Sequence, residues 1–219
     1  MPTGLEVIHP NGINQLGSSG GALFVLASKG VMTVSENSQY QLPRSQAGEL
    51  LFLSAPAGVS VCRGAGVAGG NSHTIKILGA GTNSLKWYTF KRASDLINLS
   101  LDGFGLQVFL ENGDISYHSS MKIARFINFA KVPDNSPAEV ESVFNPEKNA
   151  VLLTSSRYRV IPSGSVINMG VLHMDCLQFR AGRVAVGLLG VGLVPMPNFQ
   201  DPTLAMKGGH LLSIDVSNY

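Results

Sequence analysis

The amino-acid sequence predicts an all-β protein made of two tandem antiparallel β-sandwich domains of the immunoglobulin-like type. Three observations support this fold class. Apolar and polar residues alternate with period two in short segments. Turn-forming Ser, Gly, Asn and Pro separate these segments, and amphipathic helical patterns are scarce. A segment near the start of the chain also recurs 101 residues later, which is about the length of one sandwich domain.

The expected strands follow one another along the whole chain. The first covers residues 4–9, and Asn11-Gly12 after it supplies the positive φ values of a tight hairpin. Residues 137–143 fit two helical turns or a strand almost equally well. The other expected strands are residues 22–27, 49–54, 58–62, 74–78, 84–90, 105–109, 114–117, 122–130, 150–154, 158–161, 165–172, 176–180, 183–189 and 211–216.

An internal repeat sets the expected domain boundary. Residues 4–19 match residues 105–120 without a gap at seven of sixteen positions. Both copies describe a glycine-led strand, an Asn-Gly turn and a returning strand that ends in Ser-Ser. Similarity at a fixed offset indicates repeated units. We therefore expect an N-terminal β-sandwich domain over residues 1–93 and a C-terminal β-sandwich domain with extra hairpins over residues 94–219.

Composition and charge argue against several protein classes. Charged residues make up 14% of the chain and the net charge is +2, which does not suit a nucleic-acid-binding surface. The longest apolar run, residues 184–194, is broken by glycines and is too short for a membrane-spanning helix. The first residues lack the pattern of a secretory signal. We expect synthesis in a cytoplasm, no nucleic-acid partner, no membrane insertion, and a low-charge surface that associates with other subunits.

The two cysteines, Cys62 and Cys176, are expected to be separate, reduced and buried. Two cysteines far apart in the chain do not make a disulfide framework, and a cytosol keeps thiols reduced. Buried thiols behave as small apolar side chains.

Two motifs resemble ligand-binding sites, and each has a simpler interpretation. Residues 64–69 fit G-x-G-x-x-G, but a strand follows them where a dinucleotide site requires a helix, so we interpret them as a loop. His173 and Cys176, with Asp175 between them, are too few for a zinc site unless copies share ligands across a symmetry axis. The other histidines, His9, His73, His118 and His210, are scattered.

The residues that could support catalysis show no recognisable spacing. There is no G-x-S-x-G elbow, and the serines at residues 17–20 and 163–165 lie in turn-like sequences. A glycosidase needs two carboxylates that flank a cleft. We therefore predict a protein that is not an enzyme, with no catalytic, cofactor-binding or metal-ligating residues and no cofactor. We interpret four acidic residues as turn or surface residues, namely Glu111, Asp114, Glu139 and Glu141.

Three aromatic residues share one expected strand. Period two places Tyr88 and Phe90 on one face of this strand and Trp87 on the other. We expect one face to pack in a sandwich core, and Trp87 could cover the joint between the domains. The alternative is an aromatic platform for a sugar.

The two opening segments resemble a group of small tail proteins of tailed bacteriophages. The resemblance lies in the Gly-Leu-Gln-Val-Phe strand at residues 105–109, the Asn-Gly turn and the Ser-Ser stop, with an aromatic strand like residues 87–90 shortly before. It covers residues 1–30 and 84–126, and the chain from about residue 130 matches only in style. The resemblance implies a virion structural component near the tail tip, baseplate or fibre attachment, and it carries over no catalytic residues.

These observations lead to an expected function without bond chemistry. We expect a structural component of a phage tail tip or baseplate, located in the virion tail, that links tail proteins or docks a fibre through buried interfaces and paired strand edges. Its expected partners are hub, fibre or baseplate subunits and further copies of itself. The alternative is a receptor- or carbohydrate-binding adhesin module at the tail end. Both functions use the same fold, so the fold does not choose between them.

Overall fold

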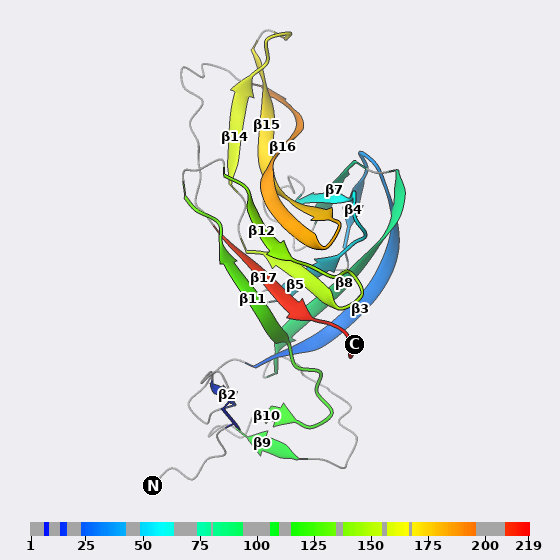
Figure 1. The fold of residues 1–219 in the computed structure, drawn as a ribbon, viewed down its shortest axis with the longest axis vertical. Helices are drawn as coiled ribbons and strands as arrows, with labels where there is room; N and C mark the ends of the chain where they lie inside the picture. The colour runs from blue at the N-terminus through cyan, green and yellow to red at the C-terminus, as the bar shows by residue number, and fades with distance from the viewer. Residues whose placement is uncertain are drawn as a thin grey trace.

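Two antiparallel β-sheets face one another across an apolar core (Figure 1). The regular structure of the described residues consists of strands, so the all-β expectation is confirmed. Within the described part of the chain, no helix is long and apolar enough to cross a membrane. The computed structural model describes residues 7–8, 14–16, 23–42, 49–63, 74–79, 81–93, 106–109, 115–134, 138–154, 157–166, 168–195 and 209–219.

Each large sheet contains strands from distant parts of the chain. The six-stranded sheet has the order β11 (Arg125–Lys131), β17 (His210–Asp215), β13 (Asn149–Leu153), β5 (Leu50–Ser54), β8 (Thr82–Arg92) and β3 (Phe24–Ser35). The seven-stranded sheet has the order β12 (Val140–Val143), β16 (Arg183–Pro195), β15 (Met169–Arg180), β6 (Ser60–Arg63), β7 (Thr74–Leu78) and β4 (Gln39–Gln41), and β14 (Tyr158–Pro162) also pairs with β15. Two short hairpins, β1 (Val7–Ile8) with β2 (Asn14–Leu16) and β9 (Gln107–Phe109) with β10 (Ile115–His118), stand apart from both sheets.

This strand order bears on the predicted domain organisation. Strands from both sides of residue 93 share each sheet, since β5 pairs with β13 and β6 pairs with β15. The tandem immunoglobulin-like arrangement is therefore not confirmed. Within each sheet the strands of residues 1–93 form one block and those of residues 94–219 form the other, and the β5–β13 and β6–β15 pairs join the two blocks.

The six-stranded sheet is apolar on both faces. On β5, Leu51 and Leu53 point into the space between the sheets, whereas Phe52 belongs to a second cluster on the outer face. Side chains from the facing sheet, such as Ile77 and Phe179, complete the inner cluster. A large hydrophobic core between the sheets thus coexists with an apolar outer surface that other chain segments must cover.

The C-terminal residue helps to cover the outer cluster. The ring of Tyr219 lies 5.7 Å from the ring of Phe90, and the Tyr219 hydroxyl donates a hydrogen bond to the carbonyl of Ile123. Phe90 in turn packs edge-to-face on Phe52, with 5.5 Å between the ring centres. Burial raises the pKa of the Tyr219 phenol.

The two repeated segments form the same hairpin. Val7 pairs with Leu16 in the first hairpin, and Val108 pairs with Tyr117 at the equivalent position of the second. The next pair, Ile8 with Asn14, likewise corresponds to Phe109 with Ile115, and each hairpin has a register shift between these two pairs. Both hairpins lie at the same end of the molecule, below the sheets in Figure 1. The repeat therefore describes a hairpin with a defined register, and the described strands after it also recur in the sheet order. In the six-stranded sheet the order β3, β8, β5 matches β11, β17, β13, and in the seven-stranded sheet the order β4, β7, β6 matches β12, β16, β15.

The prediction that the two cysteines are separate thiols is wrong. Cys62 on β6 lies directly opposite Cys176 on β15, with 4.2 Å between their Cα atoms, and the two sulfur atoms form a disulfide. The sequence separation of 114 residues hid this contact, because only the sheet order places β6 beside β15.

The longest strands extend beyond the sandwich as an arm. The outer halves of β15 and β16, together with β14, project from the sheets at the top of Figure 1. Residues 184–194, the longest apolar run in the sequence, lie partly in the sandwich and partly on the arm. Val184 and Val186 are fully buried in the inner core, whereas Leu193 on the arm is 54% exposed.

A glycine on β3 makes room for the single tryptophan. Gly30 lies opposite Trp87 on β8, and a Cβ atom added to Gly30 would lie 2.6 Å from the indole ring. The indole therefore covers the glycine and packs against the inner cluster. A side chain at residue 30 must displace this ring.

We expect Gly30→Ala to destabilise the protein by about 1–3 kcal/mol because the added methyl overpacks this site. Urea unfolding followed by tryptophan fluorescence measures the loss of stability. It also reports the displacement of the indole ring, since Trp87 is the only tryptophan and its emission should shift to the red in the variant. Gly192→Ala on β16 is the matched control, because its added Cβ would meet no atom within 4 Å. Equal stability of Gly30→Ala and the wild type would contradict this packing.

Candidate functional site

Strand β11 carries an unusual set of exposed apolar side chains. Phe126 is 51% exposed, Ile127 is 53% exposed and Phe129 is 61% exposed. Arg125 and Lys131 lie at the two ends of the strand. We call these five residues the β11 surface. Apolar side chains gathered at the edge of a sheet mark an interaction site more often than single exposed ones do.

An irregularity in the strand explains why both phenylalanines face outward. The register between β11 and β17 shifts between Phe126 and Asn128, which leaves Ile127 without a direct partner. Phe126 therefore lies opposite Ile214 and Phe129 opposite Leu212, and both partners belong to the outer apolar cluster. The β11 surface thus continues the apolar outer face to the edge of the sheet.

Ring contacts hold the two phenylalanines in place. The ring of Phe126 lies 6.2 Å from that of Phe52 in the outer cluster. The ring of Phe129 stacks on His210 of β17, with 4.5 Å between the ring centres. Each phenylalanine has one supported side and one exposed side, as expected of groups that contribute on contact with a partner.

The edge of β11 is partly closed to further strand pairing. The backbone amide of Phe129 donates to the side-chain oxygen of Asn128 at 2.7 Å. The Asn128 amide group donates to Ser142 of β12 at 2.5 Å, which links the edges of the two sheets. A side chain that occupies an edge amide discourages the addition of another strand. A partner would therefore contact the side chains of the β11 surface more readily than it would pair with the strand backbone.

The charges of the β11 surface are mainly positive. Arg125 lies opposite Asp215 of β17, and Lys131 lies opposite His210, so Lys131 has no acidic residue directly across the strand pair. Hydrogen bonds from the Ser217 hydroxyl and amide, at 2.6 and 2.9 Å, lower the pKa of Asp215, and the charges of Arg125 and Lys148 lower it further. An acidic partner surface would complement this edge.

A cluster of charged residues joins the β12 segment to the hairpin of β15 and β16. The Arg180 guanidinium contacts Glu139 at 2.6 and 2.7 Å and Glu141 at 2.8 Å, and Arg183 contacts Glu141 at 2.9 Å. The hydrogen bonds from Arg180 lower the pKa of Glu139, and those bonds raise the pKa of Arg180. These two acids, interpreted from the sequence as turn or surface residues, therefore pair with arginines at the turn between β15 and β16.

The lowered pKa of Glu139 makes this cluster sensitive to acid. A carboxyl whose pKa is lower in the folded than in the unfolded protein stabilises the fold above its ordinary pKa of about 4.5. That contribution disappears as the pH falls through the folded-state pKa. We expect the free energy of unfolding to fall less between pH 7 and pH 3 in Arg180→Gln than in the wild type, measured by urea unfolding.

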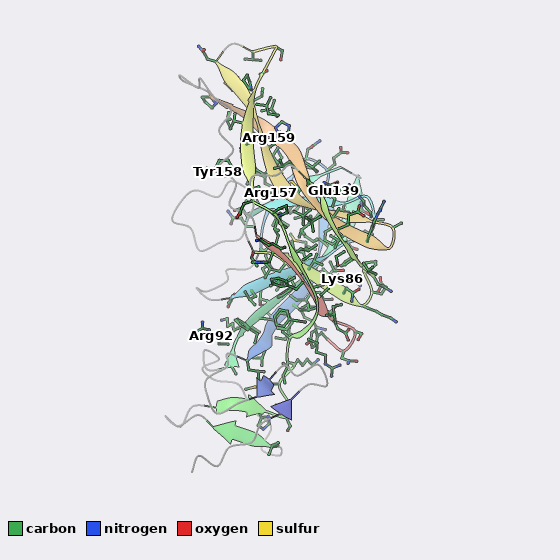
Figure 2. All side chains as sticks on the ribbon, turned by 60° about the vertical axis from the view of Figure 1, so that its left-hand side comes forward. Lys86, Arg92, Glu139, Arg157, Tyr158 and Arg159 are labelled. Carbon is green, nitrogen blue, oxygen red and sulfur yellow. A yellow bond between two sulfur atoms is a disulfide. The ribbon has the colours of Figure 1, made fainter. Side chains whose placement is uncertain are left out.

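Arg92→Gln is the control for that comparison. It removes the same charge from an exposed site, and Figure 2 shows Arg92 far from Glu139. Its pH dependence should follow the wild type. The same pH dependence in Arg180→Gln and Arg92→Gln would contradict the role assigned to the Arg180 ion pairs.

The structure gives each member of the predicted His-Asp-Cys segment a different partner. His173 contacts the backbone oxygen of Val171 through Nδ1 at 3.2 Å. Asp175 accepts hydrogen bonds from the fully buried Arg157, and the sulfur of Cys176 is bonded to Cys62. Among the described side chains, no group of three or more His, Cys, Asp or Glu residues could hold a metal ion.

Several other sequence candidates lie outside the described residues. These are the G-x-G-x-x-G segment at residues 64–69 and the serine turn at residues 17–20. His9, His73, Glu111 and Asp114 also lie outside them. The serine turn at residues 163–165 is described, and the hydroxyl groups of Ser163 and Ser165 lie 3.1 Å apart on its exposed surface.

The aromatic strand packs as period two predicts. Tyr88 and Phe90 are buried in the outer cluster, and Trp87 packs on the opposite face against the inner cluster. None of the three forms an exposed platform for a sugar. The exposed aromatic residues lie instead on β11, which sequence reasoning identified only as a strand.

No protein-family model, curated protein or solved structure matches this chain. The resemblance to phage tail proteins therefore depends on the residues of the opening segments alone.

Proposed function

We propose that this chain is a non-enzymatic structural component of a bacteriophage tail tip or baseplate that links tail proteins or docks a fibre. The observation that carries the proposal is the β11 surface, with three half-exposed apolar side chains on a supported sheet edge. The phage assignment comes from the resemblance of the opening segments. Both segments form hairpins with equivalent strand pairs, which supports their interpretation as an internal repeat.

Burial of the β11 surface would supply the free energy of attachment. Full burial of a Phe or Ile side chain stabilises by about 1.5–3 kcal/mol, and roughly half of that remains available in a half-exposed side chain. The supported rings of Phe126 and Phe129 lose little freedom on contact, because Phe52 and His210 already hold them.

The charges favour a partner of different sequence at this surface. Two copies that met antiparallel along β11 would place Arg125 of each against Lys131 of the other, and like charges in such positions repel. An acidic segment of another tail protein avoids that repulsion. Further copies of this chain would then associate through other surfaces.

A complementation experiment tests the proposal. Phage particles made without this protein are supplied with the wild type, with Phe126→Ser/Phe129→Ser, or with the control Val31→Ser. We expect the wild type and the control to enter the tail and the double variant to stay in the lysate, although circular dichroism shows that it is folded. Val31 is 68% exposed on β3, so its replacement tests loss of an apolar group elsewhere.

Imaging and mass spectrometry of purified tails give the readout. Purified tails that lack the wild-type protein would overturn the tail assignment. Normal incorporation of the double variant would leave the tail assignment intact and overturn the role of the β11 surface.

The adhesin alternative has less support. The aromatic strand that could have stacked on sugars packs in the two apolar clusters. Saturable binding of the purified protein to host cells or surface glycans would favour the adhesin over the connector.

A further inference from the structure

A cavity of about 270 Å³ opens between the two sheets where β5 begins and β13 ends. Leu51 and Val151 line it from the six-stranded sheet, and Val61 and Leu177 line it from the facing sheet. These four side chains are at most 9% exposed, so the cavity reaches into the core. It is separate from the β11 surface and does not depend on a role in a phage tail.

The size and lining of the cavity indicate the class of ligand. An apolar cavity of about 150 Å³ accepts benzene, whereas sites for drug-sized molecules begin at about 300 Å³. A cavity between these sizes fits a molecule of one or two rings. Its aliphatic walls favour an apolar ligand.

Four polar residues line the cavity, namely Glu49, Asp175, Thr74 and Thr154, and their side-chain oxygen atoms can accept a hydrogen bond. Glu49 is already paired with Lys91 at 2.6 Å, and Asp175 is paired with Arg157 at 2.8 Å. Their charges are therefore compensated, although carboxylate oxygens retain capacity for a further donor.

We propose that this cavity binds an uncharged, mainly apolar molecule of one or two rings that carries one N–H or O–H donor. An anionic ligand is disfavoured because both ionisable groups that line the cavity among the described residues are carboxylates. A cation would have to compete with Lys91 and Arg157 for the same oxygen atoms. Indole has the required size and a single donor, and we choose it as the probe.

Titration of the full-length protein with indole tests the site. Saturable shifts of the backbone NMR signals of residues around the cavity are expected, together with a melting temperature that rises with indole concentration. Benzofuran has the same shape without the N–H group, and it should bind about three- to tenfold more weakly.

Variants that fill the cavity locate the binding. Leu153→Phe places a ring into the cavity from β13 and should weaken indole binding at least tenfold. Thr74→Phe fills it from the rim on β7 if the first variant does not fold. Val31→Phe adds the same ring at a distant exposed position and should bind indole as the wild type does.

The proposal is overturned if indole shows no saturable binding up to millimolar concentration, or if a folded cavity-filling variant binds it unchanged. Equal affinity for indole and benzofuran would overturn the assignment of the carboxylates as hydrogen-bond acceptors.

Discussion

Asp175→Asn should lower the free energy of unfolding by about 3–5 kcal/mol, because it removes the carboxylate charge that pairs with the buried guanidinium of Arg157. Both side chains of this pair are fully inaccessible to solvent. The Arg157 Nε and Nη2 atoms each donate to a different oxygen of Asp175 at 2.8 Å. The backbone amide of Arg157 donates to the same carboxylate, and Nη2 also donates to the carbonyl of Ala138.

The position of this pair explains why its loss should have a large effect. Arg157 directly precedes β14, and Asp175 lies on β15 at the foot of the arm, where Figure 2 labels Arg157, Tyr158 and Arg159. The pair therefore fixes the start of the arm to the sandwich. Loss of the pair should expose the amides of β14 to hydrogen exchange before those of β5 in the core.

Two further variants make the Asp175 prediction specific. Arg183→Gln breaks an ion pair whose side chains are 53% and 37% exposed, and it should cost about 1 kcal/mol or less. The double variant Arg157→Met/Asp175→Leu replaces the buried pair by apolar groups and should recover most of the lost stability. Urea unfolding of the four proteins measures these differences. A loss below 1 kcal/mol in Asp175→Asn would show that the pair does not stabilise the fold.

The same aspartate shows where strand prediction from sequence fails. The sequence predicts two strands, at residues 165–172 and 176–180, whereas β15 is continuous over Met169–Arg180. Asp175 interrupts the apolar pattern, but its charge is neutralised by a residue 18 positions away in the chain. A pattern of single residues contains no information on such a partner. Where turns are set locally, prediction succeeds. Gly182, whose φ is 72°, lies in the gap between the strands predicted at residues 176–180 and 183–189, and this gap is the turn between β15 and β16.

Local patterns also identify faces more reliably than sheets. Period two correctly separates Trp87 from Tyr88 and Phe90, because alternation depends only on backbone geometry. The same alternation does not specify which strands are neighbours. The joining of the two halves of the chain within each sheet follows from long-range pairing, such as Val151 with Leu53, that no short segment encodes.

The β11 surface had a signal in the sequence that period two could have detected. Phe126 and Ile127 are consecutive, so a regular strand must expose one of them unless both of its faces are buried. The strand is irregular at this point, and β11 lies at the edge of its sheet. Alternation therefore predicts that one residue of this pair is exposed. It does not predict that Phe126, Ile127 and Phe129 are all exposed, because that depends on the irregularity of the strand and on its place in the sheet order.

Reduction of the Cys62–Cys176 disulfide should lower the free energy of unfolding by about 2–5 kcal/mol. The bond closes a loop between residues 114 positions apart, and cross-links of such long loops restrict the unfolded chain strongly. Both cysteines are fully buried, so the bond should be reduced in denaturant before refolding. Urea unfolding of the oxidised and reduced protein measures the difference.

The variant Cys62→Ala/Cys176→Ala separates the covalent bond from the loss of packing. Its stability should not respond to reductant, whereas that of the wild type should fall toward the reduced value. Because both cysteines lie in neighbouring strands of one sheet, the reduced protein should keep its β-sheet content by circular dichroism at low denaturant. Two titratable thiols in the unreduced, denatured wild type would show that the bond is absent. The stability of the protein would then be the same in oxidising and reducing surroundings, as expected from the sequence for a protein made in a cytoplasm.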